Sequence, residues 1–525
     1  MATIDAPPQF PRAGEQPSRR ARRLKVAGAV LLAILGALVF LLALKWPFDR
    51  EAMIRRLERA TSARVEFGKF HSTYFPPGCV AEDVRLYQQQ TQAKLPGAQK
   101  VEPLIRVQKL TITTSYAALL AKHISKIVAK GAVVHIPAGG AELKPSDPRK
   151  KNNVTIGELE ADNSVLELAP DKKGEQAMIF KVHRARFLNL GSGKTSAYKV
   201  ALSVPLPKAE VESSGWIGPW RDAGGQVRST PISGEYTVRE LDLGGFKALM
   251  GVVASQGRFQ GTLAKLSVSG ETESRDFGVK QSGHRFPLTT QFRGTVDMAS
   301  GDVELPQLNA KLGSLELEAD AQIKGKPKTV ALNVKRGRGE VQDMMMLFSD
   351  APKSPITGPI TFEMRSSLPP EKRPFKERVQ LTGSFDIDPA RFTSPNTDLD
   401  VAKLSAHARG DKKEMEDGDP APVLSNLRSQ VTLADGVAHF TGLTFGVPGA
   451  TANMAGSYSL VNRKVNLHGT MRMDAKLSQA TTGVKSVFLK LLNPFYKKKD
   501  AGAEVPVAMT GTMGHTHFGV GLTKK

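Results

Sequence analysis

The stretch Leu315-Glu-Leu-Glu-Ala-Asp-Ala-Gln-Ile-Lys324 alternates apolar and polar residues from end to end. In an extended chain, Leu315, Leu317 and Ile323 fall on one face, and the acidic side chains fall on the other. A period of two is typical of a β-strand that has one dry face and one solvated face. The stretch therefore predicts one strand of an antiparallel sheet.

The same alternation recurs from about residue 65 onward, with glycine-containing turns between the runs. The apolar face of three further runs carries Tyr198, Val200, Leu202, then Val379, Leu381, Phe385, then Val465, Leu467, Met471 and Met473. With Leu315, Leu317 and Ile323, these residues are the candidates for an apolar groove. The pattern predicts a mainly β protein with antiparallel strands as its body.

Helical patterns are few and short. We expect a helix after Asp49 and others over residues 115–130, 245–254, 340–348 and 482–492. Four or five short helices cannot cover the apolar face of roughly two dozen strands. The dry faces must therefore meet one another, as in a sandwich or a barrel, or meet something that is not protein.

The N-terminal segment predicts a membrane anchor. Residues 1–25 read as a disordered, basic cytoplasmic tail, and they precede an uncharged apolar run over residues 26–44. A helix of this length spans about 28 Å, close to the thickness of a bilayer's hydrocarbon core. We therefore predict a transmembrane helix over residues 26–45, with the N-terminus cytoplasmic. A cleaved signal peptide is the alternative, but no Ala-x-Ala site follows the run.

Composition argues against several functions. The chain has 525 residues, a formal net charge of +22 and one cysteine, Cys79, which excludes a disulfide framework and a cysteine-based zinc cluster. Gly191–Thr195 lacks the first glycine of a phosphate-binding loop and reads as a turn. His515 and His517 have no nearby third ligand. We predict no enzyme, no cofactor, no metal and, without aromatic interleaving of the basic residues, no nucleic-acid partner.

One segment concentrates positive charge near the C-terminus. An apolar stripe there lies beside lysines, and its membrane-contact candidates are Val484, Lys485, Phe488, Lys490, Leu491, Lys497, Lys498 and Lys499. The segment is either a helix that caps the end of the sheet or a basic amphipathic helix that touches anionic lipid headgroups.

Four groups of turn and packing motifs resemble those of AsmA-like proteins of the bacterial envelope. The motifs are Leu57–Val65, Phe75–Gly78 and Glu82–Leu86; residues 105–136, Val154–Leu159 and Val165–Leu168; Ile217–Trp220, Pro231–Tyr236 and Gly257–Leu263; and Gly456–Tyr458, Asp474–Ser478, Thr482–Lys485, Thr510–Thr512 and Phe518-Gly519. They cover most of the chain beyond the predicted anchor.

The resemblance implies a single-pass inner-membrane protein with most of its chain in the periplasm, folded as an elongated, curled, taco-like antiparallel β-sheet groove. It divides the periplasmic part into an N-terminal AsmA-like region, residues 46–205, and a central and C-terminal groove region, residues 206–525. It implies binding or movement of phospholipid along the groove in support of outer-membrane biogenesis, as in bridge-like lipid transfer proteins. The implied partners are phospholipid, the inner membrane, and the outer membrane or its assembly proteins. The alternative is an envelope scaffold or assembly factor that transports nothing.

Overall fold

The computed structural model describes residues 46–61, 63–88, 102–136, 154–168, 177–191, 193–205, 207–219, 227–246, 248–298, 300–325, 327–370, 372–409, 411, 422–474, 503–512 and 515–520. The predicted tail, the predicted anchor, the expected helix over residues 482–492 and all eight membrane-contact candidates lie outside these residues.

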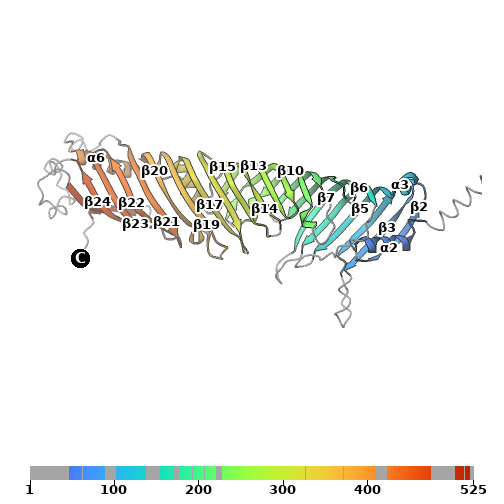
Figure 1. The fold of residues 1–525 in the computed structure, drawn as a ribbon. Coiled ribbons are helices and arrows are strands. Elements are labelled where there is room, and N and C mark those ends of the chain that lie inside the picture. Colours follow the sequence, from blue (N-terminus) through green and yellow to red (C-terminus); the bar gives the residue numbers. More distant parts are fainter. Residues whose placement is uncertain are drawn as a thin grey trace, which may run out of the picture.

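The described part is mainly β. Its strands form one long, largely antiparallel sheet, with few short helices beside it (Figure 1). The strands are β1 (Ala63–Glu66), β2 (Lys69–Thr73), β3 (Gly78–Gln88), β4 (Ile105–Thr113), β5 (His123–Ile136), β6 (Thr155–Leu168), β7 (Met178–Leu190), β8 (Ser196–Pro205), β9 (Lys208–Ile217), β10 (Pro231–Asp242), β11 (Leu249–Met250), β12 (Val252–Thr262), β13 (Lys265–Val279), β14 (Phe286–Asp297), β15 (Val303–Leu312), β16 (Leu315–Lys324), β17 (Thr329–Glu340), β18 (Ile356–Thr357), β19 (Pro359–Leu368), β20 (Gln380–Phe392), β21 (Ser425–Ala434), β22 (Val437–Val447), β23 (Ala450–Ser459), β24 (Lys464–Met473), β25 (Ala503–Thr512) and β26 (His515–Val520).

The sheet is a meander in which strands pair with their neighbours in sequence. There are three exceptions among the described strands. β1 pairs with β3, which also pairs with β2. The two-residue strands β11 and β18 pair with β13 and β20, so that β10 pairs directly with β12 and β17 with β19. Among the described strands, β5 and β6 form the one parallel pair. The strands lie across the long axis of the molecule, so the sheet grows lengthwise with each added strand (Figure 1).

Five α-helices accompany the sheet within the described residues. They are α2 (Arg50–Thr61), α3 (Tyr116–Leu120), α4 (Val341–Phe348), α5 (Phe375–Arg378) and α6 (Pro395–Arg409). The helices expected after Asp49 and over residues 340–348 are confirmed as α2 and α4. No helix was predicted from the sequence at the position of α6.

Two helix predictions were wrong. The helix expected over residues 115–130 ends at Leu120, and His123–Ile136 is strand β5, which pairs on both sides with β4 and β6. Lys122 has a φ of 54°, which ends the helical path, and Ile124, Ile127 and Val128 are β-branched residues that favour a strand. The helix expected near residues 245–254 is the 3-10 turn Leu243–Gly245 followed by β11 and the start of β12.

Helices cover the apolar face of the sheet at three places. Each place is a cluster of buried residues that joins one helix to neighbouring strands. Around α2 the cluster includes Phe48, Met53 and Val84, around α4 it includes Val341 and Val334, and around α6 it includes Val401 and Met471. We call these the α2, α4 and α6 clusters. They are the cores of the described part.

The cysteine lies in the α2 cluster and should be chemically inert in the folded protein. Cys79 is 1% exposed, and burial raises the pKa of its thiol to about 12. At pH 8 only about one thiol in ten thousand is then ionised. We expect no reaction with a thiol reagent at pH 8 until denaturant unfolds the α2 cluster. Stoichiometric labelling of the native protein within minutes would contradict this placement.

Candidate functional site

The backbone register aligns one apolar row across the whole sheet. Each residue of the row pairs directly with the next, so all members share one face. We call it the apolar strip, and its members, from β2 to β26, are Phe70, Ala81, Leu110, Ala129, Ala161, Ala185, Val200, Ser213, Tyr236, Gly257, Gly270, Phe292, Leu308, Ala319, Val334, Met364, Gly383, Val431, Phe440, Gly456, Leu467, Met509 and Phe518.

The strip takes one residue from every strand between β2 and β26 except β11 and β18, and Ser213 is its one polar member. At ~4.8 Å between neighbouring strands, it runs for roughly 100 Å before twist shortens it. A pattern that is local in each strand thus becomes a continuous feature along the molecule.

Most of the predicted groove residues lie on the face that carries the strip. Val200 and Leu467 belong to the strip itself. Two residues away from a strip member in the same strand, and so on the same face, are Tyr198, Leu202, Leu317, Leu381, Phe385 and Val465. Four or six residues away are Leu315, Ile323, Met471 and Met473. Val379 is different, because it caps the end of α5 and precedes β20 instead of lying in it.

Several of these candidates are covered by the protein itself. Leu315 lies in the α4 cluster, and Leu317 and Phe385 pack against that cluster. Val465, Leu467, Met471 and Met473 lie in the α6 cluster. Tyr198, Val200, Leu202, Ile323 and Leu381 belong to none of the three clusters.

A long part of the strip has no cluster over it. Among the described residues, no member of the three clusters, buried or packed against them, lies between Ala132 in β5 and Phe277 in β13. Along this part, Val200, Tyr236, Phe259 and Val268 are only partly buried, whereas Ala185 and Tyr198 are buried by residues outside the three clusters. We call the strip and its same-face neighbours from β6 to β12, together with Val268 on β13, the uncovered stretch.

Tyrosine hydroxyls lie close to glycines in the uncovered stretch. A Cβ atom placed on Gly234 would lie 2.5 Å from the Tyr198 hydroxyl, and one placed on Gly270 would lie 2.6 Å from the Tyr236 hydroxyl. Each hydroxyl therefore occupies the space that a side chain at the glycine would need. Glycine at these positions lets the tyrosine reach across the neighbouring strand.

Serine hydroxyls hold these rings in place. The Tyr198 hydroxyl lies 3.1 Å from Ser213 Oγ, and Tyr236 bonds to Ser255 in the same way two strands further on. Ser213 and Ser255 each stand two residues before the glycine that pairs with the tyrosine. Burial raises the pKa of both tyrosines, so both stay neutral at physiological pH. The hydroxyls of these two tyrosines are thus paired and uncharged.

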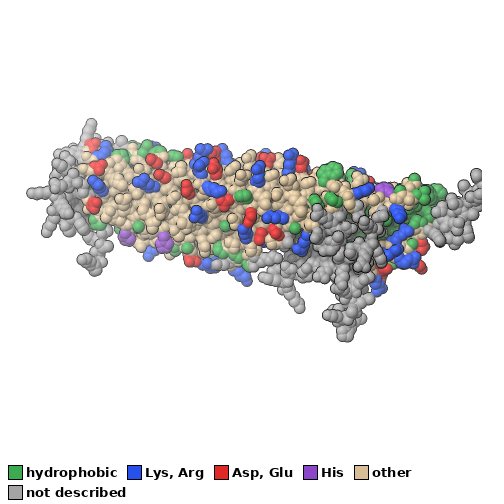
Figure 2. Space-filling model, in the orientation of Figure 1, with side chains coloured by type: hydrophobic (Ala, Val, Ile, Leu, Met, Phe, Trp, Pro, Cys, Tyr) green, Lys and Arg blue, Asp and Glu red, His purple; other side chains and the backbone are tan. Residues whose placement is uncertain are grey.

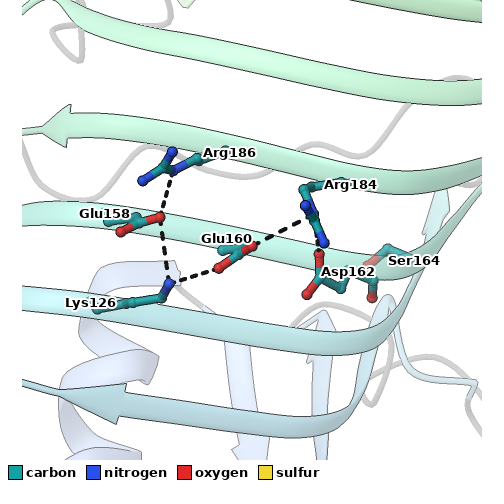
Figure 3. A network of polar contacts seen from close by, with 7 residues as sticks. All are labelled: Lys126, Glu158, Glu160, Asp162, Ser164, Arg184 and Arg186. Carbon is teal, nitrogen blue, oxygen red and sulfur yellow. Dashed lines mark hydrogen bonds and ion pairs between the residues drawn. The ribbon is translucent and has the colours of Figure 1, made fainter.

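The opposite face carries the charges. On β5, β6 and β7, directly behind Ala129, Ala161 and Ala185, a network of ion pairs joins the parallel pair to the next strand (Figure 3). Arg186 Nε lies 2.6 Å from Glu158 Oε1, and Lys126 Nζ lies 2.8 Å from Glu160 Oε2. Further contacts link Lys126 to Glu158 and Arg184 to Glu160 and Asp162.

This network should make the protein sensitive to acid. The hydrogen bond from Arg186, with help from Lys126, lowers the pKa of Glu158 below its ordinary value of 4.5. The stabilisation is then present above about pH 4.5 and is lost as pH falls through the lowered pKa. We expect Glu158→Gln to lower thermal stability between pH 5 and 8 by a constant amount, and this difference from wild type should shrink below pH 4.5. Arg186→Gln should behave in the same way, and a difference that persists at pH 3 would contradict the assignment.

Two hollows lie on the charged face. One, of about 640 Å³, lies over β10 and β12–β15 and is lined by Glu235, Arg258, Glu271 and Arg293 among others. The second, of about 610 Å³, lies over β17 and β19–β22 and includes Arg338, Asp386 and Arg428. Each of these residues neighbours a residue of the apolar face in its own strand, so it projects to the opposite side. The side chains that line both hollows include acidic, basic and amide groups.

The described residues give no support to a phosphate-binding or metal-binding role for the motifs found in the sequence. Gly191 and Gly193–Thr195 lie between β7 and β8, where a turn was expected, and Gly193 has a φ of 73°. Within the described ranges, no three His, Cys, Asp or Glu side chains come together as metal ligands. His515 and His517 fall in β26, whose side chains are outside the described part. No helix of the described residues is long and apolar enough to cross a membrane.

Sequence reasoning missed the glycines of the site. Gly257, Gly270, Gly383 and Gly456 belong to the strip, yet glycine carries no apolar signal in an alternation pattern. The available signal was the repeated spacing Ser213-x-Gly215 and Ser255-x-Gly257, each after a strand that carries a tyrosine. Only the pairing of strands shows that this spacing places a hydroxyl and a bare backbone beside the same ring.

Comparison of the sequence and the structure with known proteins found no similar protein. No protein family matches the chain, and neither a curated protein nor a solved structure is detectably similar to it. What the structure defines is a class of architecture, a long single-sheet β protein with one apolar and one charged face. The resemblance to AsmA-like proteins stays a prediction.

Proposed function

We propose that the apolar strip binds the acyl chains of phospholipid and lets them move along the sheet. In this proposal the sheet curls around the strip as a groove, and the protein is anchored in the inner membrane with its sheet in the periplasm. It supports the biogenesis and integrity of the outer membrane. It acts as a binding surface and not as an enzyme.

The observation that carries the proposal is the continuity of the strip. Acyl chains need an apolar surface without charged or unpaired polar groups, since each such group would be desolvated at a cost. From Phe70 to Phe518 the strip has one polar member, Ser213, and its hydroxyl is already bonded to Tyr198 and to the Glu235 carbonyl. Contact with the strip stabilises an acyl chain by about 25 cal/mol per Å² of apolar area removed from water. This free energy offsets the cost of taking the chain out of the bilayer.

Uniformity along the strip supports movement as well as binding. Small residues follow one another in the uncovered stretch, among them Ala161, Ala185, Ser213 and Gly257, so successive positions offer an acyl chain similar contacts. Similar affinity at successive positions keeps the barriers between them low. The charged face, with its many ion pairs, stays solvated and keeps the protein soluble on that side.

The test is capture of lipid by one face and not by the other. A photo-crosslinking amino acid at position 259 in β12, incorporated in cells, should capture phospholipid that mass spectrometry of the purified full chain identifies. The matched control is position 258, whose native Arg258 belongs to the opposite face and is paired with Glu235 at 3.0 Å. Equal capture at both positions, or none at position 259, would count against a lipid-binding strip.

The scaffold alternative is favoured by the three clusters. At these places the apolar face is packed by the protein's own helices, as expected if the sheet only holds other envelope proteins. In that case a crosslinker at position 259 should capture protein and no lipid.

A further inference from the structure

Exposed aromatic and aliphatic side chains gather at the end of the sheet that carries β2 and α3. Tyr74 and Phe75 form the turn after β2, and Tyr116 and Leu120 begin and end α3. Phe75 is 87% exposed and Leu120 is 90% exposed, the highest values among the exposed large hydrophobic side chains of the described part. Figure 2 shows hydrophobic side chains at this end of the molecule, next to basic ones.

Contacts between the rings make these side chains one surface. The rings of Trp46 and Tyr74 lie 4.9 Å apart, and those of Phe75 and Tyr116 lie 5.9 Å apart. The Tyr116 hydroxyl donates a hydrogen bond of 2.9 Å to the Tyr74 carbonyl and thereby ties α3 to the β2–β3 turn. We call Trp46, Tyr74, Phe75, Tyr116 and Leu120 the aromatic tip.

The aromatic tip lies where the chain would leave a membrane. Trp46 is 8% exposed and packs into the tip, and it follows the apolar run of residues 26–44 after a single residue. Two residues of chain reach at most about 7 Å. If the apolar run spans a bilayer, the tip is therefore held within the headgroup layer of that bilayer.

The chemistry of the tip fits such a layer. Tyrosine is enriched at membrane interfaces because its ring is amphipathic, and Tyr74 and Tyr116 are both exposed, while the buried Trp46 packs beneath them. Phe75 and Leu120 offer apolar groups to the start of the acyl region. Basic groups stand beside them: Lys122 follows Leu120, and Arg56, on α2, donates a hydrogen bond of 3.0 Å to the Pro47 carbonyl. Cations in this position favour anionic headgroups.

We propose that the aromatic tip inserts into the interface of the same bilayer that holds the predicted anchor. Insertion at a second point, beside the anchor, fixes the orientation of β2 and β3 against the membrane. The strip begins on these two strands, at Phe70 and Ala81, so the apolar face would start at the bilayer surface. The proposal rests on the predicted span, and it holds whether or not the strip carries lipid.

Hydroxyl-radical footprinting of the full chain tests the insertion. The chain is placed in nanodiscs of phosphatidylethanolamine and phosphatidylglycerol, and separately in amphipol, which covers a transmembrane segment without providing a bilayer. Phe75 and Leu120 should be oxidised about fivefold more slowly in nanodiscs, because lipid shields them. Trp216, 57% exposed on β9, is the internal control and should react equally in both. Equal rates for Phe75 and Leu120 in the two environments, whether fast or slow, overturn the proposal.

A double variant separates insertion from folding. Phe75→Asp with Leu120→Asp changes two exposed side chains, so the unfolding temperature should match wild type. In nanodiscs its Tyr74 and Tyr116 should be oxidised as fast as in amphipol. Leu424→Asp, a change at an equally apolar but distant residue that is 51% exposed, should leave the protection of Tyr74 and Tyr116 intact. Persistent protection in the double variant would show that insertion does not depend on the tip. Capture of lipid at position 259 tests the strip independently of either result.

Discussion

Replacing Phe259 with aspartate should remove lipid from the protein and leave its fold intact. Phe259 lies beside the strip on β12, is partly buried and belongs to none of the three clusters. A carboxylate there would have to lose water whenever an acyl chain passes, at a cost of about 3 kcal/mol or more. Since 1.4 kcal/mol is a factor of ten, we expect bound phospholipid to fall about a hundredfold. Lipid mass spectrometry of the purified full chain measures this loss.

The control for Phe259→Asp is the neighbouring position on the other face. Arg258→Asp adds the same carboxylate to the charged face and removes one exposed ion pair with Glu235, which is worth at most about 1 kcal/mol. It should keep both the lipid content and the unfolding temperature of wild type. If instead Phe259→Asp unfolds the protein, the uncovered stretch is packed by the protein's own side chains. That result would support the scaffold alternative.

Replacing Val334 with aspartate should unfold the centre of the sheet. Val334 belongs to the strip but lies in the α4 cluster and is 1% exposed. An unpaired carboxylate buried there costs about 4 kcal/mol or more, a large part of the stability of an ordinary domain. We expect the thermal transition to fall by more than about 10 °C or the protein to be recovered only as aggregate.

Val334→Ala serves as the comparison for Val334→Asp. It removes two methyl groups without adding charge and should cost about 1–2 kcal/mol, so the protein should still fold. Differential scanning calorimetry of the two variants gives the ranking. If Val334→Asp were as stable as wild type, α4 would not cover the strip, and the apolar face would be open there too.

The alternation of single strands was enough to predict the sheet. Leu315–Lys324 is strand β16 with the predicted bounds, since a period of two follows from the geometry of one extended chain. The helix predicted over residues 115–130 was wrong, because the spacing of its apolar residues did not distinguish a helix from a strand. Pairing with β4 and β6 decided the outcome.

For the candidate site too, the sequence predicted one part and the packing determined the other. The chain alone placed Val200 and Leu467 on a dry face, and it could not distinguish one from the other. Packing then put Leu467 in the α6 cluster and left Val200 in the uncovered stretch. That difference depends on where α6 lies over the sheet, and the sequence of neither strand carries this information.

By itself, the sequence determined which side chains share a face, because alternation is a property of each strand's own backbone. The tertiary structure decided which residues of different strands lie side by side, because that depends on register, bulges and hydrogen bonding between strands. The strip exists only through this second step: glycines, alanines and aromatic residues scattered over more than four hundred positions become one apolar line when every strand is paired with the next.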